Sequence, residues 1–114
     1  MFLFKQEHVE PILNGTKTQT RRIWKRRRAV PGSLHWAQRD LTPGSRFARL
    51  RVLRVWQERL RSIGHEDANA EGYPHRLAYL AAFKQISGHK MRVTNPVVWC
   101  VEFELVEAVR DEAA

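Results

Sequence analysis

The chain has 114 residues, 43% of them hydrophobic and 28% charged, a composition that excludes intrinsic disorder and predicts one globular domain over residues 1–114. No apolar run approaches the ~20 residues of a membrane-spanning helix, so we expect a cytoplasmic protein with no membrane partner. The single cysteine, Cys100, excludes an internal disulfide and a multi-cysteine zinc site.

The positive charge of the chain is concentrated in its first half. The net charge is +8, and residues 1–57 hold 13 basic and 3 acidic side chains, whereas residues 58–114 hold 7 and 9. A surface of this kind binds polyanions such as RNA by releasing counterions. The excess of 15 Arg over 5 Lys suits contacts with phosphates and bases, although genome composition produces the same bias equally often.

The first third of the chain predicts a strand, a helix, a strand and a loop. Residues 2–5 are typical of a short strand, and the apolar spacing in residues 8–13 indicates a helix that ends at Gly15. The Thr-rich segment 16–22 predicts a strand in its second part. We expect residues 28–41 to form a long loop, because they contain a Pro-Gly pair and no clear periodicity.

Extended structure is expected over residues 47–63. Apolar and Arg residues alternate in its first part, which indicates a strand with one face toward the core. Leu53 breaks the alternation and predicts a bulge. Because Leu60 stands between two arginines, we expect a second strand there.

Two helices and a strand are expected in the last part of the chain. The first helix begins after Gly64 and ends at Gly72, and the second opens at Pro74 and closes at residues 87–89. We expect its apolar face to comprise Leu77, Tyr79, Leu80, Phe83 and Ile86. Residues 99–105 alternate apolar and polar side chains and predict a strand, with Cys100 as a buried or edge thiol.

These elements together favour an α+β fold. Strands outnumber helices in a short chain, which is typical of a small β-barrel or strongly bent sheet with peripheral helices packed outside. Closing such a sheet protects its edge strands from pairing with other chains.

One motif carries a family resemblance. The segment from Gly15 to Arg22 resembles the ASCH-domain signature G-x-K-x-x-E-x-R, with Gly15, Lys17 and Arg22 matching and Thr20 in place of the Glu. Residues 63–73 and 96–103 resemble two further segments of that family, in the same order. The resemblance implies a PUA-like small β-barrel with a cleft between barrel and helices, a class of fold associated with RNA.

A finer resemblance concerns three residues. Lys17, Thr20 and Glu71 fall where a bacterial ASCH branch, which hydrolyses N4-acetylcytidine to cytidine and acetate, has Lys, Thr and Glu. Under the hypothesis that this activity carries over, Thr20 attacks the amide, Lys17 acts as base or proton shuttle, and Glu71 orients the lysine or assists the leaving amine. For that role the pKa of Lys17 must fall by about three units from ~10.4, through burial or the charges of Arg21 and Arg22.

The same three residues also have a purely structural interpretation, in which Thr20 is a strand residue, Lys17 is solvated or binds phosphate, and Glu71 neutralises a neighbouring cation. Oxyanion donors are a further requirement of amide hydrolysis. Backbone amides around Gly15 are candidates for them.

Residues 21–28 hold six basic side chains in eight positions. A charge run is often only a solvated loop, but tryptophans beside arginines are suited to stacking bases while phosphates are neutralised. The residues expected to bind nucleic acid or substrate are Gly15, Arg21, Arg22, Trp24, Arg26, Arg27, Arg28, Trp36 and Tyr73.

Three functions follow, and no metal or cofactor is expected for any of them. The five histidines are dispersed and lack ligand spacing. The first function is binding of RNA or a modified nucleoside in a basic cleft, with hydrolysis of the acyl amide of N4-acetylcytidine. The second is a non-catalytic RNA-binding module. The third is a ribonuclease, which ranks last because no His pair for acid-base cleavage is evident. The sequence leaves the oligomeric state open.

Overall fold

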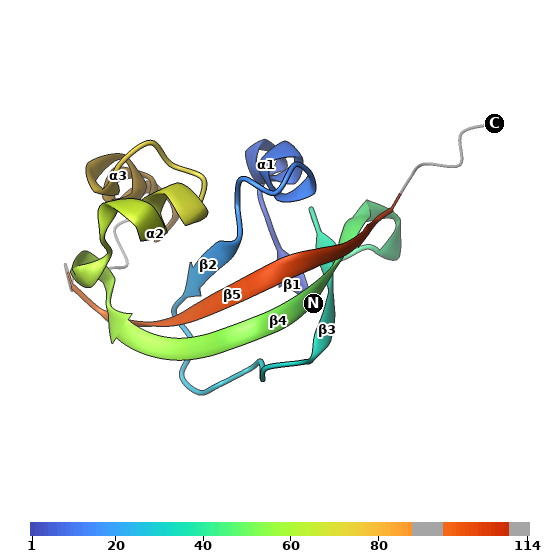
Figure 1. The fold of residues 1–114 in the computed structure, drawn as a ribbon, viewed down its shortest axis with the longest axis horizontal. Coiled ribbons are helices and arrows are strands. Elements are labelled where there is room, and N and C mark those ends of the chain that lie inside the picture. Colours follow the sequence, from blue (N-terminus) through green and yellow to red (C-terminus); the bar gives the residue numbers. More distant parts are fainter. Residues whose placement is uncertain (88–94, 110–114) are drawn as a thin grey trace.

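The computed structural model describes residues 1–87 and 95–109, which form five strands, three α-helices and three short 3₁₀ helices (Figure 1). In chain order these elements are β1 (Phe2–Leu3), η1 (Gln6–His8), α1 (Val9–Leu13), β2 (Gln19–Arg22), β3 (Leu34–Gln38), η2 (Pro43–Ser45), β4 (Arg46–Arg59), η3 (Leu60–Ser62), α2 (His65–Ala70), α3 (Arg76–Ser87) and β5 (Val97–Ala108).

The strands form one sheet in the order β1-β3-β4-β5-β2. β1 pairs with β3 in parallel, and the other neighbours are antiparallel. The long strands β4 and β5 curve together, and the three helices lie over the concave side of the sheet (Figure 1). The predicted α+β, PUA-like architecture is therefore confirmed as a curled half-barrel with peripheral helices.

The long strand β4 bends without stopping. Its register against β5 shifts between Val52 and Arg54, which confirms the bulge predicted at Leu53. The expected second strand around Leu60 is wrong, because β4 runs unbroken to Arg59 and Leu60–Ser62 turns as a 3₁₀ helix. A bulge adds local twist to a strand and does not end it.

The expectation of a loop over residues 28–41 is wrong at β3. Leu34 is exposed, whereas Ala37 and Gln38 are both buried, so no period of two marks this strand in the sequence. β3 forms because it pairs with β1 on one side and β4 on the other. Pairing partners distant in the chain decided this element.

Two hydrophobic clusters share strand β5, which lies between β4 and the edge strand β2. Val101 and Phe103 pack with β1, α1 and the first half of β4 in the first cluster. Val98 and Cys100 pack in the second cluster with Leu60, Ile63, Ala68, Tyr79 and Phe83. Val98 and Cys100 are buried in one cluster, and Val101 and Phe103 are buried in the other. The buried side chains of β5 therefore switch from even to odd positions between Cys100 and Val101, and the strand contributes to both clusters.

The helices agree with the sequence except at α3. Gly64 precedes α2 and Gly72 follows it with a φ of +99°, a conformation that suits glycine. α3 begins at Arg76, two residues after Pro74, and Leu77 is 65% exposed and so lies outside the apolar face. Part of the expected closure of this helix, residues 88–89, lies outside the described residues.

The two edge strands of the sheet, β1 and β2, are linked by a side chain. Arg22 Nη2 donates a hydrogen bond of 2.7 Å to the carbonyl oxygen of Leu3. This side-chain contact spans the gap between the two edges of the half-barrel, and in residues 1–87 and 95–109 no backbone pairing joins β1 to β2. Within the same ranges no helix is long and apolar enough to cross a membrane.

Candidate functional site

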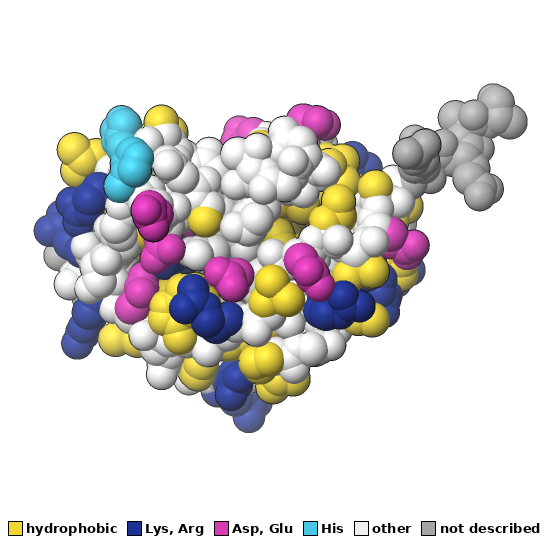
Figure 2. Space-filling model, in the orientation of Figure 1, with side chains coloured by type: hydrophobic (Ala, Val, Ile, Leu, Met, Phe, Trp, Pro, Cys, Tyr) yellow, Lys and Arg dark blue, Asp and Glu magenta, His cyan; other side chains and the backbone are white. Residues whose placement is uncertain are grey.

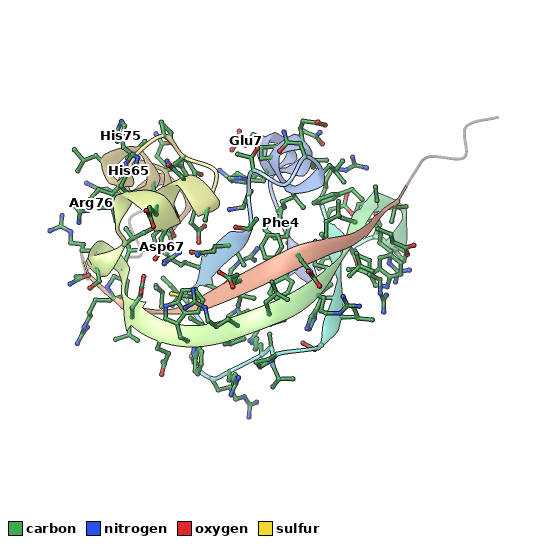
Figure 3. The ribbon with its side chains drawn as sticks, in the orientation of Figure 1. Phe4, Glu7, His65, Asp67, His75 and Arg76 are labelled. Atoms are coloured by element: carbon green, nitrogen blue, oxygen red, sulfur yellow. The ribbon has the colours of Figure 1, made fainter. Side chains whose placement is uncertain are left out.

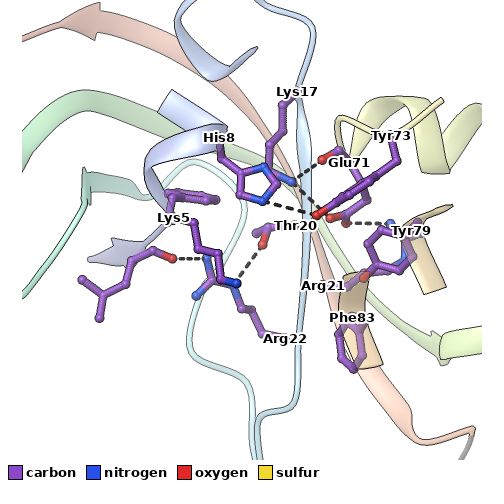
Figure 4. A pocket seen from close by; sticks show the side chains of 12 residues that line it. Lys5, His8, Lys17, Thr20, Arg21, Arg22, Glu71, Tyr73, Tyr79 and Phe83 are labelled. Atoms are coloured by element: carbon purple, nitrogen blue, oxygen red, sulfur yellow. Dashed lines mark hydrogen bonds and ion pairs between the residues drawn. The ribbon is translucent and has the colours of Figure 1, made fainter. Parts of the chain in front are cut away.

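A pocket of about 160 Å³ lies where β1 and β2 face the C-terminal end of α2 (Figure 4). It separates the two hydrophobic clusters, since Phe4 belongs to the first and Tyr79 and Phe83 to the second. Its volume is below the ~300–1,000 Å³ of pockets for drug-sized ligands, which suits one planar ring with a small substituent. The residues that line it are Leu3, Phe4, Lys5, His8, Lys17, Thr20, Arg21, Arg22, Glu71, Tyr73, Tyr79 and Phe83.

Lys17 is buried in this pocket, with 3% of its surface exposed. Its Nζ donates to the backbone oxygen of Glu71 at 2.5 Å and to Glu71 Oε1 at 3.2 Å. The backbone holds this segment beside α2, because Thr18 N donates to Ala70 O at 2.7 Å. Burial lowers the pKa of Lys17, and the charges of Arg22 and Arg21 lower it further against the opposing effect of Glu71.

Glu71 is the shared carboxylate of a buried ion network. Its Oε2 accepts a hydrogen bond of 3.0 Å from Arg21 Nη1, whose side chain is fully buried. Arg21 also donates to Glu58 at 2.7 Å and to Asp67 at 3.3 Å. Figure 3 shows Asp67 on the side of α2 that faces the sheet. Removing one partner of such a network leaves an unpaired buried charge and costs about 3–5 kcal/mol.

Thr20 and Arg22 form the other polar pair of the pocket. Thr20 is 4% exposed, and its Oγ1 accepts a hydrogen bond of 2.9 Å from Arg22 Nε. The two residues lie two positions apart on β2, so they share one face of the strand. Among the hydrogen bonds of the described residues, none joins Thr20 Oγ1 to Lys17 or Glu71 directly, and these groups often draw together only when substrate is bound.

Aromatic side chains form the wall of the pocket on the helix side. Tyr73 packs edge-on against both His8 and Tyr79, with ring centroids 5.9 Å and 5.4 Å apart. The Tyr73 hydroxyl lies 3.4 Å from His8 Nε2. Burial lowers the pKa of His8 to about 4, assisted by the charges of Lys17, Lys5 and Arg22, so the ring is neutral at neutral pH, and the tautomer sets the direction of its hydrogen bond with the Tyr73 hydroxyl.

Several lining residues escaped the sequence interpretation. His8 stood among dispersed histidines, and Tyr79 and Phe83 were expected only as core. Both of these aromatic residues are buried and also face the pocket. No local pattern marks a residue of η1 or α3 as part of a site, because only the fold brings these elements beside β2.

All three catalytic candidates, Lys17, Thr20 and Glu71, line the pocket. Three of the residues expected to bind substrate, Arg21, Arg22 and Tyr73, line it as well, while the others lie elsewhere. Gly15 ends α1 with a φ of +83°, as the helix stop predicted, and does not line the pocket. Trp24 stacks on Phe2, with centroids 6.1 Å apart, and packs against the first cluster.

Trp36 lies on β3 between two arginines. The guanidinium groups of Arg46 and Arg49 are 4.6 Å and 4.4 Å from its ring centroid. These cations cover the indole, and neither Trp36 nor Trp24 is among the residues that line the pocket. The predicted part of the two tryptophans in nucleic-acid binding therefore lies outside this pocket and stays a prediction.

Arg26, Arg27 and Arg28 are exposed and also lie outside the pocket. Their segment passes beneath β4, on the side of the sheet opposite the helices (Figure 1). On the strands above it, Arg51 and Arg54 pair with Glu104 and Glu102 at 2.8 Å and 3.4 Å. Figure 2 shows basic and acidic side chains interspersed over the β4–β5 ribbon, with basic side chains projecting below it.

Metal and thiol chemistry find little support in the described parts of the chain. Over residues 1–87 and 95–109, no group of three or more His, Cys, Asp or Glu side chains is placed to hold a metal ion. Cys100 is buried, as expected, and burial raises the pKa of its thiol to about 12. One histidine, His8, lines the pocket, and a ribonuclease that uses a pair of histidines would need a second.

No protein-family model matches this sequence, and no curated protein sequence matches it significantly. Solved structures do match its fold. An ASCH domain from Lactobacillus crispatus is 13% identical, with a TM-score of 0.73 over 93% of this chain and 77% of that chain. A DUF984 protein from Enterococcus faecalis is 17% identical, with a TM-score of 0.69 over 95% and 75%.

A mutant ASCH protein from Zymomonas mobilis is 11% identical, with a TM-score of 0.63 over 96% of this chain and 71% of that chain. These similarities span nearly the whole chain. The chain therefore has the fold of the ASCH domains, and the fold implied by the motif Gly15 to Arg22 is confirmed. At such low identities the likeness concerns the fold and carries no substrate or reaction.

Proposed function

We propose that this protein binds a modified cytidine nucleoside in the pocket and hydrolyses the acyl amide of N4-acetylcytidine. The observation that carries the proposal is the convergence of an amine, a hydroxyl and a carboxylate in one pocket. Lys17 and Thr20 flank the start of β2, and Glu71, 54 residues beyond Lys17, follows α2. The ring of the nucleoside would lie against the aromatic wall of Tyr73 and Tyr79.

The proposed hydrolysis takes two steps at the acyl carbon: Thr20 first displaces cytidine, and water then displaces Thr20. Thr20 Oγ1 bonds to the acyl carbon and its proton passes to Lys17 Nζ, directly or through one water. The carbon–nitrogen bond then breaks, and N4 of cytidine leaves with the proton from Lys17. Water hydrolyses the acyl-threonine ester, which releases acetate and restores the hydroxyl. Glu71 orients the amine through the two contacts it makes with Nζ.

Release of cytidine from N4-acetylcytidine, followed by liquid chromatography, tests this function. We expect turnover by the wild-type protein, and a loss of roughly a thousandfold in kcat for Thr20→Val, which removes the hydroxyl at nearly constant shape. Thr20→Ser keeps a nucleophile and should retain much of the activity. Lys17→Met should also abolish turnover, and its thermal unfolding must be recorded because Lys17 is buried.

Two results of this assay would contradict the proposed function. No release of cytidine at high protein concentration, or undiminished release by Thr20→Val, would remove the amidohydrolase proposal. The pH dependence adds a second check. Because burial lowers the pKa of Lys17, kcat/KM should rise with pH and level off below the ordinary lysine pKa of 10.5.

The alternative is a non-catalytic RNA-binding module, and one observation favours it. Arg26, Arg27 and Arg28 are consecutive, exposed and, among the described residues, joined to no carboxylate. Arg27 Nε donates to the carbonyl oxygen of Ala29 at 2.9 Å. Three exposed guanidinium groups with no carboxylate partner among the described residues are suited to binding successive phosphates of a single strand. This segment is separate from the pocket, so RNA binding and hydrolysis are independently testable.

A further inference from the structure

Arg22 is the cation of the pocket that has a fixed position and no carboxylate partner in the described part of the chain. Lys17 and Arg21 both pair with Glu71. Arg22 instead donates from Nε to Thr20 Oγ1 at 2.9 Å and from Nη2 to Leu3 O at 2.7 Å. Its guanidinium lies 5.0 Å from the centroid of Phe4. Hydrogen bonds to neutral oxygens and an aromatic face therefore hold its positive charge in place.

The geometry of the guanidinium leaves one donor beside the hydroxyl of Thr20. The group is planar, and Nε–H is parallel to one of the two N–H bonds of Nη2. Figure 4 shows the bonds to Thr20 and Leu3 leaving the guanidinium on different sides. Leu3 O therefore takes the outer Nη2–H, and the inner one points into the space next to Thr20 Oγ1.

We propose that Arg22 is a catalytic residue that stabilises the tetrahedral adduct formed at Thr20. Its Nε–H donates a hydrogen bond to Thr20 Oγ1, and its inner Nη2–H donates one to the former carbonyl oxygen. This inference rests on the proposed function. When Thr20 Oγ1 bonds to the acyl carbon, the carbonyl electron pair moves onto the carbonyl oxygen, and both oxygens then lie on one carbon. That O–C–O unit has nearly the spacing of a carboxylate, which an arginine fork binds in bidentate fashion.

The placement of Arg22 suits charge that develops only during reaction. Arg22 Nε–H already donates to Thr20 Oγ1 before substrate binds, so little reorganisation is needed when the oxyanion forms. The guanidinium stays charged at neutral pH, even though burial lowers its pKa. A backbone oxyanion hole at Gly15 is not required, and Gly15 does not line the pocket.

The kinetics of variants test this role with N4-acetylcytidine as substrate. We expect Arg22→Gln to lower kcat about 10²- to 10³-fold and to change KM little, because the second prong acts only in the transition state. Arg22→Lys keeps the charge without the fork and should still lose at least tenfold. Added guanidinium ion should restore part of the activity of Arg22→Ala and none of that of Thr20→Val.

Lys5→Gln is the matched control for charge. Lys5 also lines the pocket but is exposed, and it makes no hydrogen bond to Thr20. A general effect of positive charge would lower kcat equally in Lys5→Gln and Arg22→Gln, and that result would overturn the proposal. Thermal unfolding of each variant shows whether a loss reflects folding, and guanidinium rescue keeps the test valid for a weakened variant.

Binding of a stable mimic provides a readout apart from turnover. The N4-methylphosphonamidate of cytidine presents two oxygens that share one negative charge on a tetrahedral centre, and cytidine itself has no such group. We expect the wild-type protein to bind the mimic at least tenfold more tightly than cytidine, and Arg22→Gln to bind the two alike. Equal affinities in the wild type would overturn the role of Arg22. Undiminished turnover in Arg22→Gln would overturn this role alone, whereas absent turnover in the wild type would overturn the proposed function and this role together.

Discussion

Burial sets the protonation of single residues around the pocket. Lys17 and His8 both have lowered pKa values, and desolvation is the largest cause for each. The sequence required such a lowering for Lys17 to act as a base, and the structure confirms its direction and its two causes, burial and the neighbouring arginines. For His8 no such expectation existed, because nothing in the sequence shows that η1 faces β2.

The neutral His8 makes the stability of the protein depend on pH. Its pKa is about 4 in the folded protein against 6.5 ordinarily, so the unfolded chain binds more protons between these values and stability falls as pH falls from 6.5 to 4. Because His8 is only partly buried, we expect the loss to be about 1–2 kcal/mol. Urea denaturation at several pH values measures it.

The variant His8→Gln should lack the loss of stability that His8 causes between pH 6.5 and 4, because glutamine does not titrate. The exposed His65, at the start of α2, offers a matched control, and His65→Gln should follow the wild-type curve. Parallel pH curves for the wild type and His8→Gln would contradict the interpretation.

At the scale of elements, β2 contributes polar side chains from both of its faces, and three of them line the pocket. Thr20 and Arg22 share one face and are hydrogen-bonded to each other. Gln19 and Arg21 share the other, where Arg21 Nη1 donates to Gln19 Oε1 at 2.8 Å. The strand was predicted from its Thr-rich sequence, and the alternation of a strand then dictates these pairs. What each face meets depends on α2 and β1, which lie far away in the sequence.

The C-terminal end of α2 positions Glu71 through Gly72. Gly72 has a φ of +99°, and a Cβ placed there would stand 3.6 Å from Cδ of Lys17. We expect Gly72→Ala to lower the free energy of unfolding by about 1–2 kcal/mol, because L side chains are strained in this conformation. Denaturant titration measures the change.

Gly44→Ala provides the control for this glycine, since Gly44 has open space around its Cα and no positive φ. It should alter stability by less than about 0.5 kcal/mol. Equal effects of the two substitutions would show that the turn after α2 does not need glycine.

At the scale of the whole molecule, the two basic features lie on opposite sides of the sheet. The pocket lies on the concave side with the helices, and the segment with Arg26, Arg27 and Arg28 passes beneath β4 (Figure 1). The positive charge of residues 1–57 is therefore divided between a small enclosed site and an open surface. The ion pairs of Arg51 and Arg54 leave little free charge on the strands between them.

RNA binding by this open surface should be separable from hydrolysis. Replacing Arg26, Arg27 and Arg28 together by Glu should weaken binding of a single-stranded RNA several-fold and reduce the slope of log K against log salt by about 2, because about three phosphate contacts are lost. Hydrolysis of N4-acetylcytidine should stay within twofold. Fluorescence anisotropy over a salt series measures the binding.

A triple variant of other exposed cations, with Arg39, Arg61 and Lys84 changed to Glu, controls for total charge. If both triple variants weaken RNA equally, the segment is not a specific surface. A flat salt response of the wild type would remove the RNA-binding alternative altogether.

Local patterns determined the elements and the chemistry that the chain offers. Apolar periodicity predicted α1 and β5, the Thr-rich segment predicted β2, and flanking glycines predicted α2. The motif from Gly15 to Arg22 indicated the ASCH fold that the solved structures confirm. These features depend on neighbours within a few residues, so a single sequence contains them. The resemblance to the bacterial ASCH branch likewise predicted that Lys17, Thr20 and Glu71 share one site, and all three line the pocket.

Only the tertiary structure determined which strands pair and which side chains contact one another. β3 forms through pairing with distant strands, β5 serves two clusters, and Trp24 and Trp36 pack away from the pocket although they flank the basic segment. The partners of Arg22, and the enclosure of His8 with Tyr73, join η1, β2 and the end of α2. Contacts of this kind depend on how the sheet curls, a property of the whole chain that no short stretch of sequence encodes.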